Sequence, residues 1–204
     1  MIRRTLVFAC TLAIAFASAP LFAQGTTWQI DSAHTSAQFA VKHLMVSTVR
    51  GQFNKTTGTA TWDGKDFTAA SVDVVIDVST INTREPRRDD HLRSADFFDV
   101  AKYPTITFKS TKIEAVSPGK VKMTGDMTMR GVTKPVVFDV EGPSAPLKEQ
   151  NGTRVGASAT TTIKRSDFGL TWNRAIEAGG VAVSDEVAIT IDVEFVNRPA
   201  APGK

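Results

Sequence analysis

Apolar and polar residues alternate with a period of two through most of the chain. The segment 187–195 shows this best, since Val187, Ile189 and Ile191 alternate with polar residues such as Thr190 and Asp192. This alternation is typical of β-strands with one apolar face. The runs predict a short first strand at 28–30 and about eight long strands, at 36–42, 49–62, 70–78, 105–109, 120–129, 136–141, 155–163 and 187–195.

Within 49–62 the apolar positions change parity between Phe53 and Ala60. An inserted residue in one strand of an antiparallel pair has this effect. The pattern therefore predicts a β-bulge between Asn54 and Gly58.

Two segments, 84–103 and 166–184, lack the alternation. In the first, Asp89 or Asp90 is predicted to cap a short helix, and Phe97 and Phe98 provide an apolar anchor. We expect this segment to form a helical lid across one barrel mouth. In the second segment, residues 172–178 are predicted to form one or two helical turns.

Long antiparallel strands joined mainly by short turns favour an up-and-down barrel over a sandwich. The predicted fold is an all-β, eight-stranded antiparallel barrel over residues 24–197, with short helical segments at its mouth. Its outer face is charged and rich in threonine, so we expect the barrel to sit in water rather than to insert in a membrane. Residues 198–204 are expected to be a disordered tail.

The residues on the apolar faces are predicted to line the barrel lumen. Three of them are methionines, and the facing run 155–163 contributes mainly small side chains. Flexible thioethers opposite small residues suit a variable apolar guest, although methionines also fill ordinary cores, so a full and a hollow lumen both remain open. The predicted lumen positions are Phe39, Val41, His43, Val72, Val74, Ile76, Ile106, Phe108, Met123, Met127, Met129, Phe138, Ile163, Ile189 and Ile191.

Residues 1–23 have the pattern of a secretory signal peptide, with Arg3 and Arg4 before a short apolar core and small residues up to Ala23. We therefore expect export to the periplasm. Cys10, the only cysteine, lies in that segment, so the mature chain could form no disulfide. Two of the 24 Lys and Arg residues also lie there, which leaves 22 against 21 Asp and Glu. This balance argues against a nucleic-acid partner, which would need a concentrated basic face.

Residues that could carry chemistry are few. The three histidines, His34, His43 and His91, lie on separate segments without metal-ligand spacing, so we predict no metal site and no cofactor. No nucleophile or phosphate-loop motif occurs, and no catalytic residues are predicted. The segment 87–99 is interpreted as a structural lid, or as a lid in which His91, Arg88 or Arg93 contacts a ligand head group. The predicted head-group and lid residues are His91, Arg93, Phe97 and Phe98.

Several blocks at matching spacing resemble the YceI family of periplasmic polyisoprenoid-binding proteins, over about residues 28–195. The blocks are AQFAVKHLMVSTVRGQF, RDDHLRSADFFDVAKYPTITFKS, MTGDMTMRGVTKPVVF, KRSDFGLTW and VSDEVAITIDVEF. The resemblance implies a lipocalin-like extended barrel, often a homodimer, that holds a long isoprenoid or similar amphiphile in its lumen without catalytic residues. It also implies a role in transport or storage of isoprenoid quinones or their precursors.

Three functional hypotheses follow. The first is a periplasmic carrier with a polyisoprenoid or quinone-like lipid as ligand. The second is a lipid-modifying enzyme with His91 as general base, oriented by Asp89 or Asp90. The third is a ligand-free structural module of a respiratory electron-transfer system, whose lumen would be packed.

Overall fold

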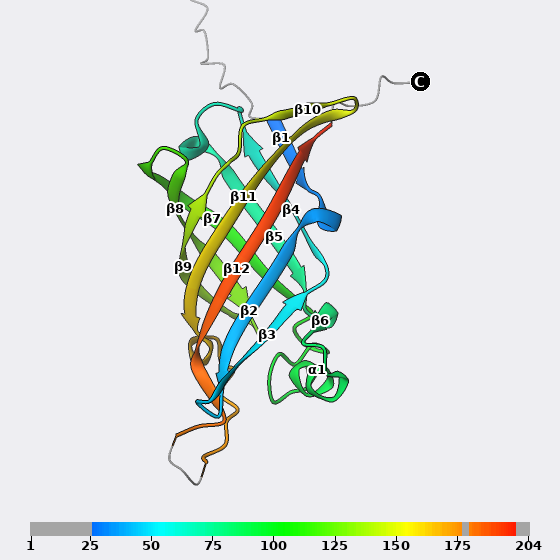
Figure 1. Ribbon diagram of the computed structural model, residues 1–204, viewed down its shortest axis with the longest axis vertical. Coiled ribbons are helices and arrows are strands. Elements are labelled where there is room, and N and C mark those ends of the chain that lie inside the picture. Colours follow the sequence, from blue (N-terminus) through cyan, green and yellow to red (C-terminus); the bar gives the residue numbers. More distant parts are fainter. Residues whose placement is uncertain (1–25, 177–179, 199–204) are drawn as a thin grey trace, which may run out of the picture.

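The computed structural model describes residues 26–176 and 180–198 (Figure 1). Its twelve strands form one antiparallel sheet that closes on itself, because β11 pairs with β12 along its whole length. The strands are β1 (Thr26–Ile30), β2 (Ser36–His43), β3 (Ser47–Phe53), β4 (Thr56–Trp62), β5 (Ser71–Asp77), β6 (Ile81–Asn82), β7 (Thr105–Ser117), β8 (Lys120–Met129), β9 (Val132–Glu141), β10 (Leu147–Glu149), β11 (Gly152–Lys164) and β12 (Val183–Asn197).

The closed ring consists of eight strands, in the order β1, β4, β5, β7, β8, β9, β11 and β12. The other strands extend this wall. β1 pairs with the end of β12 at Val196 and Phe195, and β2 continues along the same side of β12 from Asp192 to Val183. β3 and β6 continue the wall beyond β2 in the same way. The predicted eight-stranded antiparallel up-and-down barrel is therefore confirmed.

Three of the wall strands are interrupted at one level of the barrel. The 3-10 helix η1 (Ser32–His34) separates β1 from β2, and η3 (Val78–Thr80) separates β5 from β6. Between them, β3 ends at Phe53 and β4 begins at Thr56. The predicted change of parity is therefore real, but its cause is a strand break at Asn54 and Lys55 and not a β-bulge. Two hydrogen bonds stabilise this break: Asn54 N–H donates to Thr80 O, and Asp77 N–H donates to Lys55 O.

The wall formed by β7, β8 and β9 carries a large group of buried apolar side chains. Phe108 packs edge-on against Phe138, with ring centroids 5.2 Å apart. Met123 and Met127 are buried beside them. Gly125 allows this packing, since a Cβ atom there would lie 2.4 Å from the Phe108 ring.

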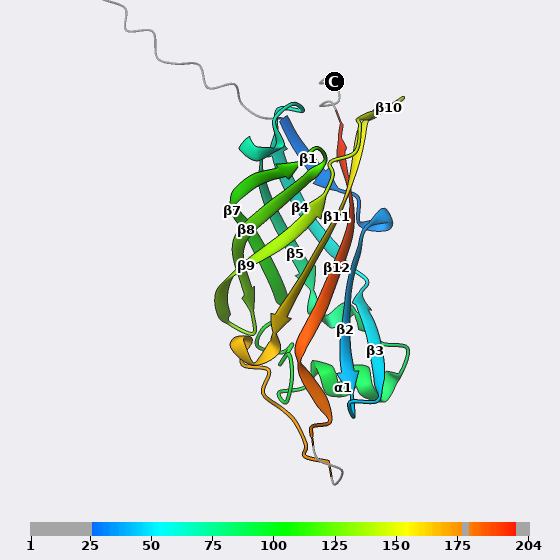
Figure 2. The same ribbon diagram turned by 60° about the vertical axis from the view of Figure 1, so that its left-hand side comes forward.

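The two segments without alternation lie at one end of the barrel, in both views of the ribbon (Figures 1 and 2). We call this the α1 end, after the helix α1 (Pro86–Arg93). The opposite end, the β10 end, carries β10 and the β7–β8 and β10–β11 turns. The two further 3-10 helices are η2 (Phe67–Ala69) and η4 (Arg165–Phe168).

Two local predictions at the α1 end are wrong. Glu85 caps α1, accepting the Arg87 and Arg88 N–H groups, because Pro86 suits the first helical position and fixes the start there. Asp89 and Asp90 instead lie inside the helix. Residues 172–176 are not helical, and the Asn173 side chain bonds to the backbone of Val183, which ties this segment to β12. The last two residues of the predicted turns, 177 and 178, lie outside the described residues.

No helix in the described ranges is long and apolar enough to cross a bilayer. The predicted signal peptide, residues 1–23, lies outside the described residues. The same holds for the predicted tail, apart from Arg198.

Candidate ligand-binding cavity

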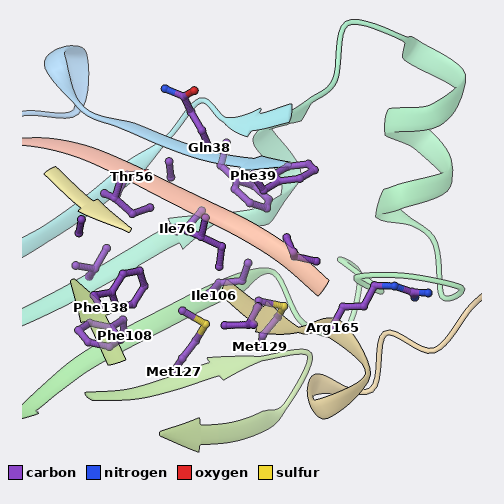
Figure 3. Close-up of a pocket in the computed structure, with 18 of the residues that line it drawn as sticks. Gln38, Phe39, Thr56, Ile76, Ile106, Phe108, Met127, Met129, Phe138 and Arg165 are labelled. Carbon is purple, nitrogen blue, oxygen red and sulfur yellow. The ribbon is translucent and has the colours of Figure 1, made fainter. Parts of the chain in front are cut away.

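The barrel encloses a cavity of about 360 Å³. Figure 3 shows Phe39, Ile76, Ile106 and Met127 turned toward one another across it. All fifteen lumen positions predicted from strand parity lie on its wall. The side-chain pattern therefore located the lumen correctly, while contact with a ligand stays a prediction.

The cavity is long and narrow. Its wall residues on β12 run from Val183 to Phe195, which corresponds to about 40 Å along a strand at about 3.3 Å per residue. A compact ligand would leave most of this length empty. The shape suits an extended hydrocarbon chain.

The inward side chains on two walls of the cavity differ in how deeply they are buried. On β7–β9 the inward side chains such as Phe108 and Met127 are buried. On β2 and β12 the inward side chains of Phe39, Val41 and Ile189 are only half-buried. Inward-pointing apolar groups that keep exposed surface show that the barrel does not fill its own lumen, because a packed core would cover them.

Small side chains on β11 help to keep the space open. Ala157 and Ala159 lie on the cavity wall, directly opposite Val193 and Ile191 of β12 in the strand register. Larger residues at these two positions would extend into the lumen. The predicted small-residue wall is therefore present at these positions.

Aromatic residues form the α1 end of the cavity. The His91 ring meets the rings of Phe97 and Trp172 edge-on, each at 5.0 Å, and Phe97 lies 5.1 Å from Trp172. Phe98 packs edge-on against Phe53 of the barrel wall at 5.8 Å. All five side chains line the cavity. The segment 87–99 is thus anchored through its two phenylalanines, as its sequence predicts.

Most charges in this segment have local partners. Asp89 is buried and accepts hydrogen bonds from the Thr83 N–H and hydroxyl groups, at 2.8 and 2.5 Å. Arg93 donates to Ser79 O, Ile81 O and Asp90. Arg93 is absent from the cavity wall, so its predicted place among the head-group residues does not match its position. Its guanidinium fastens α1 to the turn before β6.

Two other arginines, Arg88 and Arg165, do line the cavity. Arg88 donates to the Thr83 hydroxyl and carbonyl oxygens, both at 2.8 Å. Arg165 is buried and donates to Leu170 O, Trp172 O and Ser184 O. Figure 3 shows its guanidinium turned away from the methionines. Burial lowers the pKa of Arg165, which still leaves an arginine charged. Neither arginine forms an ion pair with an acidic residue of the described chain.

The three histidines do not come together in one site within the described residues. His91 Nε2 bonds to Asp96 Oδ2 at 2.9 Å, and not to Asp89 or Asp90. The hypothesis that Asp89 or Asp90 orients His91 as a general base is therefore incorrect. Asp89 accepts a hydrogen bond from Thr83, and Asp90 accepts one from Arg93. His43 is exposed at the α1 end, on the cavity wall.

One cluster in the described residues has the geometry of a metal site: the ligand atoms of Asp31, His34 and Glu194 lie within 4.8 Å of one another. Arg154 already occupies it, with Nη1 at 2.7 Å from Asp31 and 2.5 Å from Glu194. Hydrogen bonds from Arg154, and then from His34, hold the pKa of Asp31 far below its usual range. The arginine is the shared counter-ion of the two carboxylates, and the cluster serves as an ion-pair network.

The alternation of inward and outward side chains could have identified further residues of the cavity wall. Ala37, Val140, Val193 and Phe195 share strand faces with predicted residues and also line the cavity. Arg165, Leu170 and Trp172 could not be found in this way, because η4 and the loop after it have no strand period. Their only signal was the KRSDFGLTW block.

Comparison with known proteins places the chain in a family. A YceI-like domain model matches residues 28–195. A UPF0312 protein of Vibrio parahaemolyticus is 40% identical over 166 residues, which cover 80% of this chain and 87% of that protein.

Solved structures agree with this match. The YceI protein of Campylobacter jejuni is 34% identical, with a TM-score of 0.66 over 78% of this chain and 90% of that one. A polyisoprenoid binding domain from Saccharophagus degradans shares the fold, with 18% identity and a TM-score of 0.63 over 85% of this chain and 99% of that one. The chain therefore belongs to the YceI family.

Proposed function

We propose that the protein is a periplasmic carrier that holds the chain of a polyisoprenoid, or of a similar long amphiphile such as an isoprenoid quinone or its precursor, in the barrel lumen. The observation that carries this proposal is the open, narrow and apolar cavity. In this proposal the lipid is cargo, no cofactor takes part, and the protein is not an enzyme.

Apolar burial would supply the affinity. Each buried CH₂ group contributes roughly 0.8 kcal/mol, so binding should strengthen with chain length until the cavity is full. A series of prenols from farnesol to longer chains tests this by competition with a fluorescent fatty probe. Affinity that does not change with chain length would contradict the proposal.

The polar head is best placed at the α1 end. Arg88, His91 and Arg165 line the cavity there, whereas side chains such as Met123 and Phe138 farther along are apolar. A few polar groups at one end of an apolar cavity fix the orientation of a ligand. Arg88, rather than the predicted Arg93, is the arginine of α1 that can take this role.

Three further observations support the proposal. The fold is shared with a protein named for polyisoprenoid binding. The N-terminal segment has the pattern of an export signal. The half-buried inward residues of β2 and β12 also argue against a packed structural module.

The central test is to identify what co-purifies with the protein. Native mass spectrometry and organic extraction of protein exported by a bacterial host should yield a prenyl lipid. Removing that lipid should lower the melting temperature, because a ligand that binds only the folded state stabilises it. A lumen that is empty and indifferent to added isoprenoids would end the proposal.

A charge on the cavity wall tests the location of the ligand. Met127→Arg should abolish lipid binding, because a guanidinium would have to be buried against the apolar chain. Val137→Arg is the matched control, since Val137 is 46% exposed on the neighbouring strand β9. Circular dichroism verifies that both variants fold. Equal lipid binding by the two variants would exclude this cavity as the site.

Homodimer formation, which the family resemblance implies, stays a prediction. Light scattering on purified protein tests it.

A further inference from the structure

The turn between β2 and β3 has an unusual composition for its geometry. Val46 N–H bonds to His43 O at 3.0 Å, and the two central residues, Leu44 and Met45, have φ values of 51° and 59°. Positive φ at both central positions defines a turn that strongly prefers Asn-Gly. Large apolar residues adopt this backbone only at a cost in strain, and such strain tends to mark functional sites.

The side chains at this turn are exposed. Met45 is 58% exposed and Val46 is 85% exposed, and Val181 is 37% exposed nearby. Leu44 N–H bonds to Ala182 O at 2.9 Å, which joins the turn to the segment that carries Val181. We refer to Met45, Val46 and Val181 as the apolar tip. Figures 1 and 2 show the β2–β3 turn at the α1 end, beside the chain that enters β12.

The apolar tip leads directly into the cavity. His43 and Val183, the residues next to it on β2 and β12, face each other in the register and both line the cavity. Trp172 lines the cavity at the same end and is half-buried. Tryptophan favours the boundary between water and lipid. A ligand that entered beside the tip would stay in contact with apolar groups.

Exposed cations lie on the three chain segments that carry the tip. Lys42 and Arg50 lie on the outer face of the β2–β3 hairpin, and Arg174 lies on the segment before Val181. None of them forms an ion pair with an acidic residue of the described chain. Glu186 is the exposed acid closest along β12. Basic residues beside a membrane-facing surface are attracted to anionic lipid head groups.

The tip is too small for a protein partner. Three side chains on a projecting turn cannot supply the roughly 800 Å² per partner that a stable interface needs. Shallow insertion into a bilayer requires only a few apolar side chains and flanking cations. From this geometry we infer that the apolar tip docks on the anionic surface of a lipid bilayer, so that the cavity opens toward the lipid.

Flotation with vesicles tests the docking without any cargo. The protein should float with vesicles of phosphatidylglycerol and phosphatidylethanolamine. The double variant Met45→Gly, Val46→Ser should bind roughly tenfold more weakly, because it loses the apolar contacts. This variant also places glycine at a positive φ, so its folded state should not be weakened.

A matched control uses the opposite end of the barrel. Val116 and Leu147 are each 61% exposed there, and Val116→Ser, Leu147→Ser should float like the unchanged protein. The double variant Lys42→Gln, Arg174→Gln should bind anionic vesicles severalfold more weakly. Added salt should weaken vesicle binding less in this variant than in the unchanged protein.

Two results would overturn the inference: no binding of the unchanged protein to the anionic vesicles, or undiminished binding by the tip variant. The carrier role is measured separately, by uptake of a prenol added from solvent. The tip variant should retain this uptake, yet extract the same prenol from vesicles roughly tenfold more slowly. Failure of uptake from solvent would count against the carrier role and leave the docking result intact.

Discussion

The two ends of the barrel are held together in different ways. At the β10 end, the strands continue to short turns such as Pro118-Gly119 and Asn151-Gly152, and charged side chains form a partly exposed network around Arg154. At the α1 end, irregular backbone has replaced the strands. Its carbonyl groups are satisfied by buried side chains, above all Arg165.

This difference indicates which end can work as a mouth. Regular strands satisfy their own backbone groups, so the β10 end needs no special residues. The α1 end needs them, and the same irregular segments bring aromatic, basic and apolar side chains to this end of the cavity. Strained and irregular backbone at this end, including the Leu44-Met45 turn, is what one expects of a functional region.

The largest effect should follow from breaking the α1 end at Arg165. Arg165→Met removes donors to Leu170 O, Trp172 O and Ser184 O. Leaving these buried carbonyls without partners should lower the free energy of unfolding by about 3 kcal/mol. Urea denaturation measures the change. The neighbouring exposed residue gives the control, since Lys164→Met should cost less than about 0.5 kcal/mol. Similar costs for both would show that the guanidinium does not organise this end.

A smaller effect is expected at the base of α1. Asp89→Ala removes the buried acceptor of both Thr83 hydrogen bonds and should cost about 2 kcal/mol. Compared with the unchanged protein, the variant should exchange its amide hydrogens faster in α1, with little change in the barrel strands. Asp90→Ala on the same helix is the control: Asp90 is 79% exposed, and its loss should change stability by less than about 0.5 kcal/mol. Unchanged exchange in the Asp89 variant would mean that other contacts hold the helix.

The smallest effect, and one that depends on pH, belongs to the β10 end. Hydrogen bonds from Arg154 and His34 lower the pKa of Asp31. A carboxyl whose pKa is lower in the folded state than in the unfolded state stabilises the fold above the unfolded value of about 3.9, and this contribution is lost as the pH falls below it.

Asp31→Asn should therefore reduce the stability of the protein at neutral pH and flatten its decline below about pH 4. Thermal unfolding at a series of pH values measures this. Asp192→Asn, an exposed carboxyl on β12, should leave the pH profile as it is. A profile of the Asp31 variant as steep as that of the unchanged protein would show that the network does not contribute.

The fold and the cavity wall were predictable because strand parity reports side-chain direction directly. Phe39, Met127 and Ile189 lie on different strands, yet the same rule placed each of them inside. The rule failed where the backbone leaves the strand geometry. Asp89 was expected as a cap because it is a good cap residue, but Glu85 with Pro86 fixed the start of the helix earlier.

Arg93 illustrates the same limit for the candidate site. Its position in a charged segment suggested contact with a ligand, yet it binds Ser79 O and Ile81 O, while Arg88, five residues earlier, lines the cavity. Which face of an eight-residue helix meets the barrel depends on contacts such as Asp89–Thr83 and Phe98–Phe53. These join residues whose pairing no local pattern encodes.

The sequence by itself determined the strands, their inward faces and hence the barrel, because alternation is a local property of each strand. Only the tertiary structure decided that the lumen is hollow and which end of it carries the irregular backbone. Hollowness depends on whether Ala157 and Ala159 on one wall leave more room than the facing side chains fill, and that sum of volumes is fixed only when the barrel closes.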